Sequence, residues 1–426
     1  MNGRLKRILE QAQVPPVHKR YVRRAFESEF EEVVDKFLEA AENDKAALSI
    51  TGLTGTGKSA LIRNLLWHRS DIVGHHFKRI LFISDENTDL RKVPNLITNA
   101  LFSLWKEIPD EKTLELFQNG PELLLRRVID ELQKVLIILD GVYLEEVVNF
   151  FKDLRCSLII TTNRRDLTNH IDNIFTYHIT LEHTNIDDLT NLSTAYGLTN
   201  ISRHYANVLL KITGGNFGLL EKLFTAAKGS NERLKFLVDQ LRIGISTELD
   251  CISYYSHRSL YTPIDLTSSF LRPNVANQVV SLALLQMGVW LRIEILAKLW
   301  SVDLVDSNRN FICQMISAEM SHLAEFSLLD NSLDDNEIRV PPLFRHYLLA
   351  KTGTAQLTTY NKFIHRLRTD KTESKPYSDD YLLSQLVDPI KIEAALKRSC
   401  RRPSELVAKT SILDYVYEIF NHLFRR

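Results

Sequence analysis

Residues 46–59 read Ala-Ala-Leu-Ser-Ile-Thr-Gly-Leu-Thr-Gly-Thr-Gly-Lys-Ser, and this stretch decides the fold. Its first five residues, 46–50, form a short apolar run of the kind found in buried strands. Gly52–Ser59 then match G-x-x-x-x-G-K-[ST], and apolar residues continue at helical spacing as far as Leu66. The sequence therefore predicts a strand, a glycine-rich loop and a helix, which is the setting that a phosphate-binding P-loop requires.

The residue types in this loop suit a nucleotide. Glycines let the backbone curl so that successive N–H groups face one centre, and the helix N-terminus adds the positive end of its dipole. Lys58 would place its charge on the β- and γ-phosphates, and the Ser59 hydroxyl would ligate Mg²⁺. We therefore expect ATP or ADP and Mg²⁺ as cofactors. The loop residues predicted to hold the nucleotide are Gly52, Thr54, Gly55, Thr56, Gly57, Lys58, Ser59 and Ala60.

A second apolar run, Val135–Leu139, ends in Asp140. It shows no alternation of polar and apolar residues, as is typical of a parallel strand buried on both faces. The carboxyl ends of parallel strands share one edge of the sheet, so Asp140 is expected beside the P-loop. Ser59 and Asp140 are the predicted metal-binding residues.

Further strands and helices alternate along the chain. This alternation predicts an α/β fold, a P-loop NTPase with a parallel five-stranded doubly wound sheet. One more strand lies between the P-loop strand and the Asp140 strand, which favours the ATPase branch with an interposed strand over the simpler kinase branch. The remaining strands are predicted at Arg79–Ser84, Ser157–Thr161 and Thr176–Thr180, and the helices between them at Pro94–Trp105, Glu122–Leu132 and Leu144–Leu154.

Beyond the sheet the pattern becomes helical. A helical domain is predicted first, and three helices (274–287, 291–300, 308–326) with a hairpin over 328–340 then predict a winged-helix domain. Winged helices commonly bind DNA, but the acidic turn Asp330–Glu337 would oppose phosphate. The predicted domains are an N-terminal extension (1–20), a nucleotide-binding domain (21–184), a helical domain (185–250), a winged-helix domain (251–352) and C-terminal helices (353–426), the last with an apolar stripe from Leu406 to Phe424.

Composition excludes several classes of protein. Lys and Arg number 53, as do Asp and Glu, so no global field gathers nucleic acid or an acidic membrane, and no nucleic-acid partner is expected. The most apolar stretch, Val279–Leu291, is too short to span a bilayer. The four cysteines (Cys156, Cys251, Cys313, Cys400) lack metal-ligand spacing, and no signal peptide precedes them. They are expected to be reduced thiols in a cytoplasmic protein.

The ordered motifs resemble the NB-ARC core of signal-transducing ATPases, the Apaf and plant-resistance group. The likeness covers roughly residues 15–426, and the ordered set is more specific than the P-loop alone. The segments that carry it are Tyr21–Arg23, Gly52–Ser59, Ile137–Val142, Leu158–Thr162, Thr213–Phe217 and Ala297–Ser301.

The resemblance implies a switch that regulates apoptosis. ADP or ATP would sit between the three domains and govern assembly into a ring-like homo-oligomer that promotes caspase activation. A caspase and an apoptosis inhibitor would be partners, and a partner could bring the chain to organelle surfaces. Carried over by residue, Tyr21, Val22 and Arg23 would border the adenine, Arg164 would sense the γ-phosphate, and Gly215 and Phe217 would also contact the nucleotide.

Several positions depart from the family pattern. Gly141 stands where the family has a second acidic residue to activate water, so at most weak ATP hydrolysis is expected and no catalytic residue is assigned. Asn163 and Arg164 follow the threonine pair where the family reads Thr-Thr-Arg, and Gly215–Phe217 replace Gly-x-Pro. The Met-His-Asp motif falls on residues 340–342, with His346 one turn further as a candidate substitute or simply a packed histidine.

The N-terminus leaves alternatives open. The family activator carries a six-helix recruitment domain, whereas only about 20 residues precede Tyr21, too few to bury a core. The chain could be shortened, or recruitment could use another surface. One alternative function is a decoy that co-assembles with a full-length relative and regulates it. A third is an origin-type or transposition-type ATPase that uses its winged helix on DNA.

Overall fold

The computed structural model describes most of the first 352 residues. The described residues are 3–69, 71–72, 75–84, 93–105, 120–171, 175–181, 184–198, 201–242, 264, 278–285, 290–300, 309–332 and 337–352. The chain divides into two compact units. The first comprises Met1–Ala195 with Glu325–Ser327, and the second comprises Tyr196–Ala324 with Leu328–Arg426.

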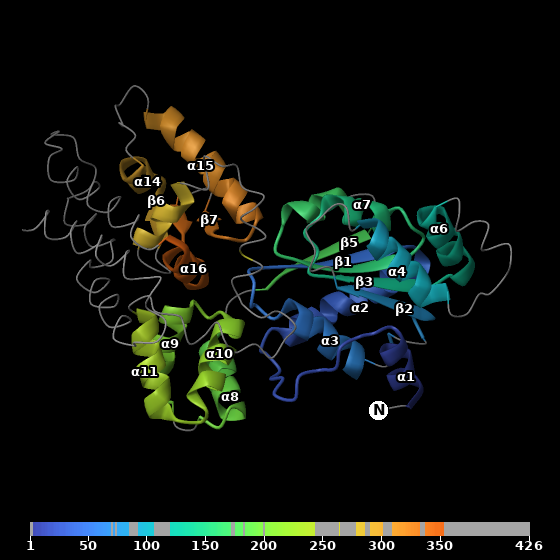
Figure 1. The fold of residues 1–426 in the computed structure, drawn as a ribbon, viewed down its shortest axis with the longest axis horizontal. Helices are drawn as coiled ribbons and strands as arrows, with labels where there is room; N and C mark the ends of the chain where they lie inside the picture. The colour runs from blue at the N-terminus through green and yellow to red at the C-terminus, as the bar shows by residue number, and fades with distance from the viewer. Residues whose placement is uncertain are drawn as a thin grey trace, which may run out of the picture. The chain divides into compact units, whose positions relative to one another are not determined.

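The first unit is built on a parallel sheet of five strands in the order β2-β3-β4-β1-β5 (Figure 1). The run that enters the P-loop forms β1, and β4 separates it from β3, the strand that ends in Asp140. The prediction of a doubly wound sheet with an interposed strand is confirmed. The strands are β1 (Ala46–Thr51), β2 (Arg79–Ser84), β3 (Val135–Asp140), β4 (Ser157–Thr162) and β5 (Phe175–Thr180).

Helices cover both faces of this sheet. In Figure 1, α1, α2 and α3 lie below it, and α6 and α7 lie above it, with α4 packed beside α6. Phe30, Val34, Phe37 and Leu38 of α2 are buried at the helical spacing expected of an amphipathic helix. The helices are α1 (Gly3–Gln11), α2 (Glu27–Asn43), α3 (Lys58–His68), α4 (Val93–Trp105), α6 (Pro121–Leu132), α7 (Glu145–Lys152), the 3-10 helix η2 (Asp166–Ile171) and α8 (Ile186–Ala195).

The strands β1, β3 and β4 are buried along their whole length, as their unbroken apolar runs predict. One core cluster joins the sheet to the helices below it. Leu9 of α1, Phe37 of α2 and Ile62 of α3 are fully buried in this cluster together with Leu48 of β1. The P-loop therefore leaves a rigid strand and enters a helix that is packed over its length.

The second unit begins with three helices, α9 (Arg203–Thr213), α10 (Phe217–Ala227) and α11 (Asn231–Arg242). Ser202 caps α9 by accepting a hydrogen bond from the N–H of Tyr205, and Asn216 caps α10 in the same way from Leu219. Gly214 ends α9 in the left-handed conformation, with φ of 62°. The helical pattern predicted for this stretch is therefore present.

The rest of the second unit combines helices with a small antiparallel sheet. The sheet has the order β6-β8-β7, and its hairpin lies within the predicted 328–340. The ring of Trp290 on β6 lies under the guanidinium of Arg339, with 5.0 Å between the ring centroid and Cζ. The elements are η3 (Val280–Leu284), β6 (Trp290–Arg292), α14 (Ile293–Leu299), α15 (Arg309–Glu325), β7 (Asp330–Ser332), β8 (Glu337–Arg339) and α16 (Pro342–Thr352).

The helix predicted over 274–287 is present over residues 278–284 of the described part, but mostly as a 3-10 helix. Only 278–279 are α-helical, η3 follows, and Leu285 is extended. The Ser281 hydroxyl donates to the Gln278 carbonyl at 2.6 Å and accepts from the Trp300 indole at 2.8 Å. Side-chain to backbone hydrogen bonds of this kind compete with the helical ladder, which explains the tighter turn.

Two further predictions fall partly or wholly outside the described residues. The C-terminal helices and the apolar stripe from Leu406 to Phe424 lie outside them. Of the acidic turn, Asp330 and Glu337 are described, and both are paired: Asp330 Oδ2 lies 2.8 Å from Arg339 Nη2, and Glu337 lies 3.9 Å from Arg292.

Among the helices that the structure describes, none combines the length and apolar character needed to cross a membrane.

Candidate nucleotide-binding site

The P-loop backbone has the shape that its glycines allow. Gly52 and Gly57 have φ angles of 142° and 96°, which side-chain-bearing residues rarely adopt. A Cβ atom at Gly52 would lie 3.1 Å from the Leu181 carbonyl oxygen. Gly57 is the N-cap of α3 and makes no side-chain hydrogen bond to its first turn. The loop therefore presents backbone and a helix N-terminus, the arrangement that binds phosphate.

Lys58 is buried at the centre of the loop. Its Nζ donates to the carbonyl oxygens of Gly52 (2.7 Å) and Leu53 (3.1 Å) and to Asn163 Oδ1 (2.6 Å). Burial lowers the pKa of Lys58 to about 7, and the nearby Asp140 carboxylate opposes this shift only in part. The side chain thus sits where its charged form lacks a full anionic partner.

Asn163 contacts the P-loop lysine, a contact that sequence reasoning missed. Besides accepting from Lys58, its amide nitrogen donates to Thr54 Oγ1 (2.7 Å) and to the Tyr143 hydroxyl (3.0 Å). It is 7% exposed and follows the last residue of β4 directly. Its place after the threonine pair was a signal, but only the order of the strands in space shows that it faces the P-loop lysine.

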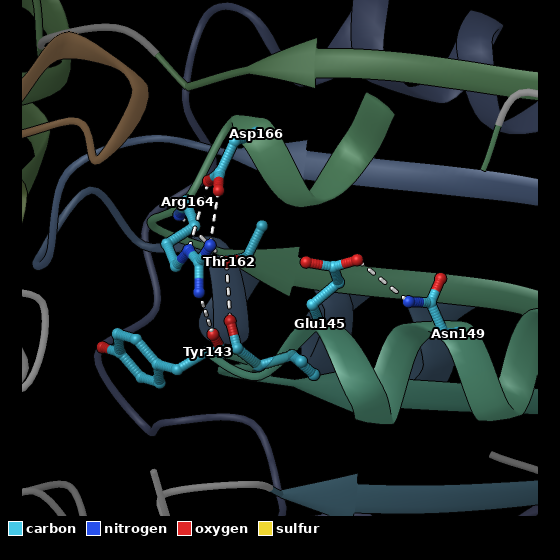
Figure 2. A network of polar contacts seen from close by, with 7 residues as sticks. Tyr143, Glu145, Asn149, Thr162, Arg164 and Asp166 are labelled. Carbon is cyan, nitrogen blue, oxygen red and sulfur yellow. Dashed lines mark hydrogen bonds and ion pairs between the residues drawn. The ribbon is translucent and has the colours of Figure 1, made fainter. Parts of the chain in front are cut away.

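Arg164, the predicted γ-phosphate sensor, is held by Asp166 and by the turn after β3 (Figure 2). Its Nη1 donates to the Tyr143 carbonyl oxygen at 2.7 Å, and its other nitrogens bond to the Asp166 carboxylate. Its backbone N–H donates to Thr162 Oγ1 at 3.0 Å. Asn163, rather than Arg164, therefore contacts the P-loop in this structure, and the sensing role of Arg164 stays a prediction.

The two predicted metal ligands are adjacent. Ser59 Oγ donates to Asp140 Oδ1 at 2.7 Å, and Thr161 Oγ1 donates to the same oxygen at 2.6 Å. The second oxygen, Oδ2, lies 3.5 Å from Arg63 Nη2, one turn after Ser59 on α3. A hydroxyl and a buried carboxylate fit the hard oxygen donors that Mg²⁺ prefers. Arg63 is a cation at this position that sequence reasoning missed.

Gly141 follows Asp140 with φ of 77°. Its N–H donates to Thr161 Oγ1 at 2.8 Å, and the N–H also approaches the Thr161 carbonyl oxygen at 3.1 Å. This tight turn places no carboxylate beside Asp140. The residue can neither orient nor deprotonate an attacking water.

Of the segment predicted to border the adenine, Tyr21 and Arg23 bond to α2 instead. The Tyr21 hydroxyl donates to Glu27 Oε1 (2.8 Å), and Arg23 pairs with Glu31 (3.0 Å). The next residue, Arg24, reaches the P-loop: its Nη1 donates to the Thr56 carbonyl oxygen at 2.6 Å. Burial lowers the pKa of Arg24, although neighbouring carboxylates oppose the shift. The role of Val22 stays a prediction.

A hydrogen bond ties this N-terminal segment to α8. The N–H of Ala25 donates to Asp188 Oδ1 at 2.9 Å, and Asp188 is 4% exposed. Arg24 and Asp188 also attract each other electrostatically. The residues just before α2 therefore connect the P-loop to the first helix after the sheet.

Gly215, Phe217 and His346 belong to the second unit. Gly215 has φ of 66°, and Phe217 is the first residue of α10. His346, on α16, is buried with its Nε2 3.4 Å from the Ile212 carbonyl oxygen of α9. Burial and the adjacent Arg345 lower the pKa of His346 to about 4. The contribution of these residues to a nucleotide site stays a prediction.

The fold and the P-loop define a nucleotide-binding protein of the P-loop NTPase class. Residues 26–200 match the model of the NB-ARC domain, which confirms the resemblance recognised from the motifs. The chain is 22% identical over 334 residues to Cell death protein 4 of Caenorhabditis elegans, covering 75% of this chain and 59% of that protein. It is 19% identical over 340 residues to Cell death protein 4 of Caenorhabditis briggsae, covering 70% and 58%. The chain thus spans less than two thirds of these relatives.

Several solved structures are similar to this chain at low scores. A signal transduction ATPase with numerous domains from Pyrococcus horikoshii, with a tetratricopeptide repeat sensor, has a TM-score of 0.34 and 15% identity over 96% of this chain and 51% of its own. The Walker-type ATPase of Pyrococcus abyssi has a TM-score of 0.46 and 13% identity, covering 79% and 99%. The ORC2 protein of Aeropyrum pernix has a TM-score of 0.44 and 12% identity, covering 83% and 98%.

Proposed function

We propose that this chain is an ATP- or ADP-binding switch that regulates cell death. The observation that carries the nucleotide site is the network around Lys58, in which a buried lysine is surrounded by uncharged oxygens at the start of an uncapped helix. A phosphate supplies the anionic oxygens that this lysine lacks. The NB-ARC match over residues 26–200 supports the same site.

Lys58 would act by exchanging partners. On binding, the ammonium turns from the carbonyls of Gly52 and Leu53 to phosphate oxygens, and the helix N-terminus holds the same group. This exchange also releases Asn163 Oδ1 from Lys58. The Asn163 amide would then be available to sense the terminal phosphate. The switch thus begins with three side chains that already touch: Lys58, Asn163 and Thr54.

Mg²⁺, when bound, would neutralise part of the phosphate charge. Ser59 and Asp140 are the residues that would hold it, because their oxygens already lie 2.7 Å apart. Arg63 faces the other oxygen of Asp140, Oδ2, with its Nη2 3.5 Å away. The metal and Arg63 would therefore share one carboxylate.

The chain would bind nucleotide and hydrolyse it slowly. Gly141 offers no base, and the Arg164 guanidinium is bonded to Asp166 and to the Tyr143 carbonyl oxygen. Loss of a general base costs roughly 10²–10⁴-fold in rate. Steady phosphate release at the rates of active NTPases, on the order of 1 per second or faster, would contradict this proposal.

For the downstream action, we propose nucleotide-dependent assembly of several copies in the cytosol and promotion of caspase activation. The support is the similarity to Cell death protein 4 across 70–75% of this chain. An apoptosis inhibitor is the partner proposed to hold the assembly in check. DNA is not proposed as a ligand. The arginines beside the two described acidic residues of the hairpin are each paired with a carboxylate, which offsets the positive charge that a phosphate would need.

The nucleotide site is tested with one variant and one matched control. Lys58→Ala should abolish retention of ADP and ATP through purification, measured by mass spectrometry of the released nucleotide. Lys36→Ala, an exposed lysine on α2, should retain it as the unchanged chain does. Tightly bound nucleotide in Lys58→Ala would show that the site is misplaced.

The assembly is tested separately. Light scattering with ATP, with ADP and without nucleotide should show a larger species in one nucleotide state, and that species should raise the activity of an added procaspase. Lys58→Ala should stay small in all three conditions. Nucleotide binding without any change of size would retain the site and overturn the assembly.

A further inference from the structure

A cluster of imidazole and carboxylate groups lies at the edge of the sheet away from the P-loop. Glu42 is in the last turn of α2, and His75 and His76 lie in the turn before β2. One ligand atom from each of the three residues lies within 4.8 Å of the other two. The nucleotide site uses none of these residues.

The topology separates this cluster from the P-loop. All strands of the sheet are parallel, so β1 and β2 begin at one edge and end at the other. Glu42 precedes β1 and His76 precedes β2, whereas the P-loop follows β1. A six-residue strand is about 20 Å long, so the cluster and the phosphate site are about that far apart.

The contacts inside the cluster are close but poorly aligned for hydrogen bonding. Glu42 Oε1 lies 3.0 Å from His76 Nδ1, yet this buried nitrogen makes no hydrogen bond that satisfies normal geometry. The His75 and His76 rings meet edge to face, with centroids 4.8 Å apart and planes at 73°. The rings therefore approach each other without stacking.

We propose that Glu42, His75 and His76 form a Zn²⁺ site. Two imidazole nitrogens and one carboxylate oxygen are a known donor set for zinc, and a site of three protein ligands keeps a fourth position for water or another ligand. Donors around a tetrahedral zinc at about 2.0–2.1 Å lie roughly 3.3 Å apart. The ligand atoms lie within 4.8 Å of one another, and the exposed side chains of Glu42 and His75 would move to close the remaining distance.

The charged residues next to the cluster are paired with one another. The N–H of His76 donates to the Asp71 carbonyl oxygen at 3.3 Å, which anchors the turn. The Asp71 carboxylate lies 2.6 Å from Arg69, and Arg69 also bonds to Asp35. Asp71 is thus held by an arginine and is not the fourth ligand. Bound zinc would join the end of α2 to the turn before β2.

The test is a zinc titration of the full chain against a chromophoric chelator. The unchanged chain should bind one equivalent of Zn²⁺ tightly. His76→Ala, His75→Ala and Glu42→Gln should each bind this equivalent at least about tenfold more weakly. The matched controls are His68→Ala, an exposed histidine on α3, and Glu39→Gln, one turn earlier on α2. Both should bind as the unchanged chain does.

Two further readouts keep the outcome decisive. Co²⁺ in place of zinc should give the visible absorption of a four-coordinate site in the unchanged chain and lose it in Glu42→Gln, whose far-ultraviolet circular dichroism should be unaltered. Equal zinc binding by the unchanged chain and the three site variants would overturn the proposal and leave an ion pair. One zinc shared by two chains would overturn the single-chain site as well.

Discussion

Lys58 in the first unit and His346 in the second are both buried bases, and they differ in what surrounds them. Lys58 donates to three oxygens between 2.6 and 3.1 Å, and one of them belongs to a side chain. His346 has one long contact of 3.4 Å to a backbone carbonyl, and a buried arginine precedes it. Burial lowers the pKa of each, to about 7 and about 4.

The comparison shows that burial alone does not mark a binding site. The oxygens around Lys58 are weak partners that a phosphate replaces with stronger ones. The surroundings of His346 instead favour the neutral imidazole, because burial and, to a lesser extent, the Arg345 charge disfavour a proton there. We therefore regard Lys58 as the ligand-binding base and His346 as a packing residue of the second unit.

The largest expected effect is on nucleotide affinity. Removal of one partner of a buried charge pair costs about 2–5 kcal/mol, which corresponds to roughly 30- to several-thousand-fold. Lys58→Ala should weaken ADP binding by that factor in isothermal titration, and His346→Gln should change it less than about threefold. A comparable loss in His346→Gln would break the distinction between the two bases.

The next effect is the acid sensitivity of the second unit. A histidine with a pKa of about 4 when folded and 6.5 when unfolded stabilises the fold fully above pH 6.5, and this contribution is lost as the pH falls towards 4. The unfolding free energy should thus drop by about 2 kcal/mol between pH 7 and pH 5 through this group. His346→Gln should lack that part of the drop in urea titrations at both pH values.

Asn163 and Arg164 provide a smaller and sharper contrast. Asn163→Ala removes the amide that bonds to both Lys58 and Thr54, and it should weaken nucleotide binding about tenfold. Arg164→Ala should change binding less than about threefold, because its guanidinium bonds to Asp166 and Tyr143. The reverse order in a titration with ATP would restore Arg164 as the sensor.

The smallest expected effect is the uptake of a proton by Lys58 when nucleotide binds. At pH 8 a lysine with a pKa of about 7 is mostly neutral, and it must take up close to one proton to face phosphate. Binding heats of ADP measured in two buffers of different ionisation enthalpy should reveal this uptake, and the uptake should vanish at pH 6. Equal heats in both buffers at pH 8 would show that Lys58 is already charged.

Much of the first unit could be predicted from the sequence because buried parallel strands appear as unbroken apolar runs. The strands 79–84 and 135–140 have the predicted bounds, and the P-loop glycines have the positive φ angles that the motif requires. The 3-10 form of the helix predicted over 274–287 could not be foreseen, because it depends on the Ser281 hydroxyl, which bonds to the backbone and to Trp300. Hydrophobic periodicity does not register such a bond.

In the candidate site, too, some features could be predicted from the sequence and others could not. The proximity of Ser59 and Asp140 follows from the motif and from the shared edge of parallel strands. The roles of Arg63 and Asn163 depend on side-chain directions across α3 and β4, which no spacing rule provides. The contact of Arg24 with the P-loop, next to the segment predicted to border the adenine, could not be predicted from the sequence either.

The turn at Gly141 affects how the chain can evolve. A single base change converts a glycine codon to aspartate or glutamate, so a carboxylate beside Asp140 is one mutation away. However, the backbone there has φ of 77°, where a residue with a side chain is disfavoured by about 1–2 kcal/mol, and its N–H is committed to Thr161. A carboxylate at position 141 would therefore come at a cost to the turn that holds Asp140 and Thr161 together.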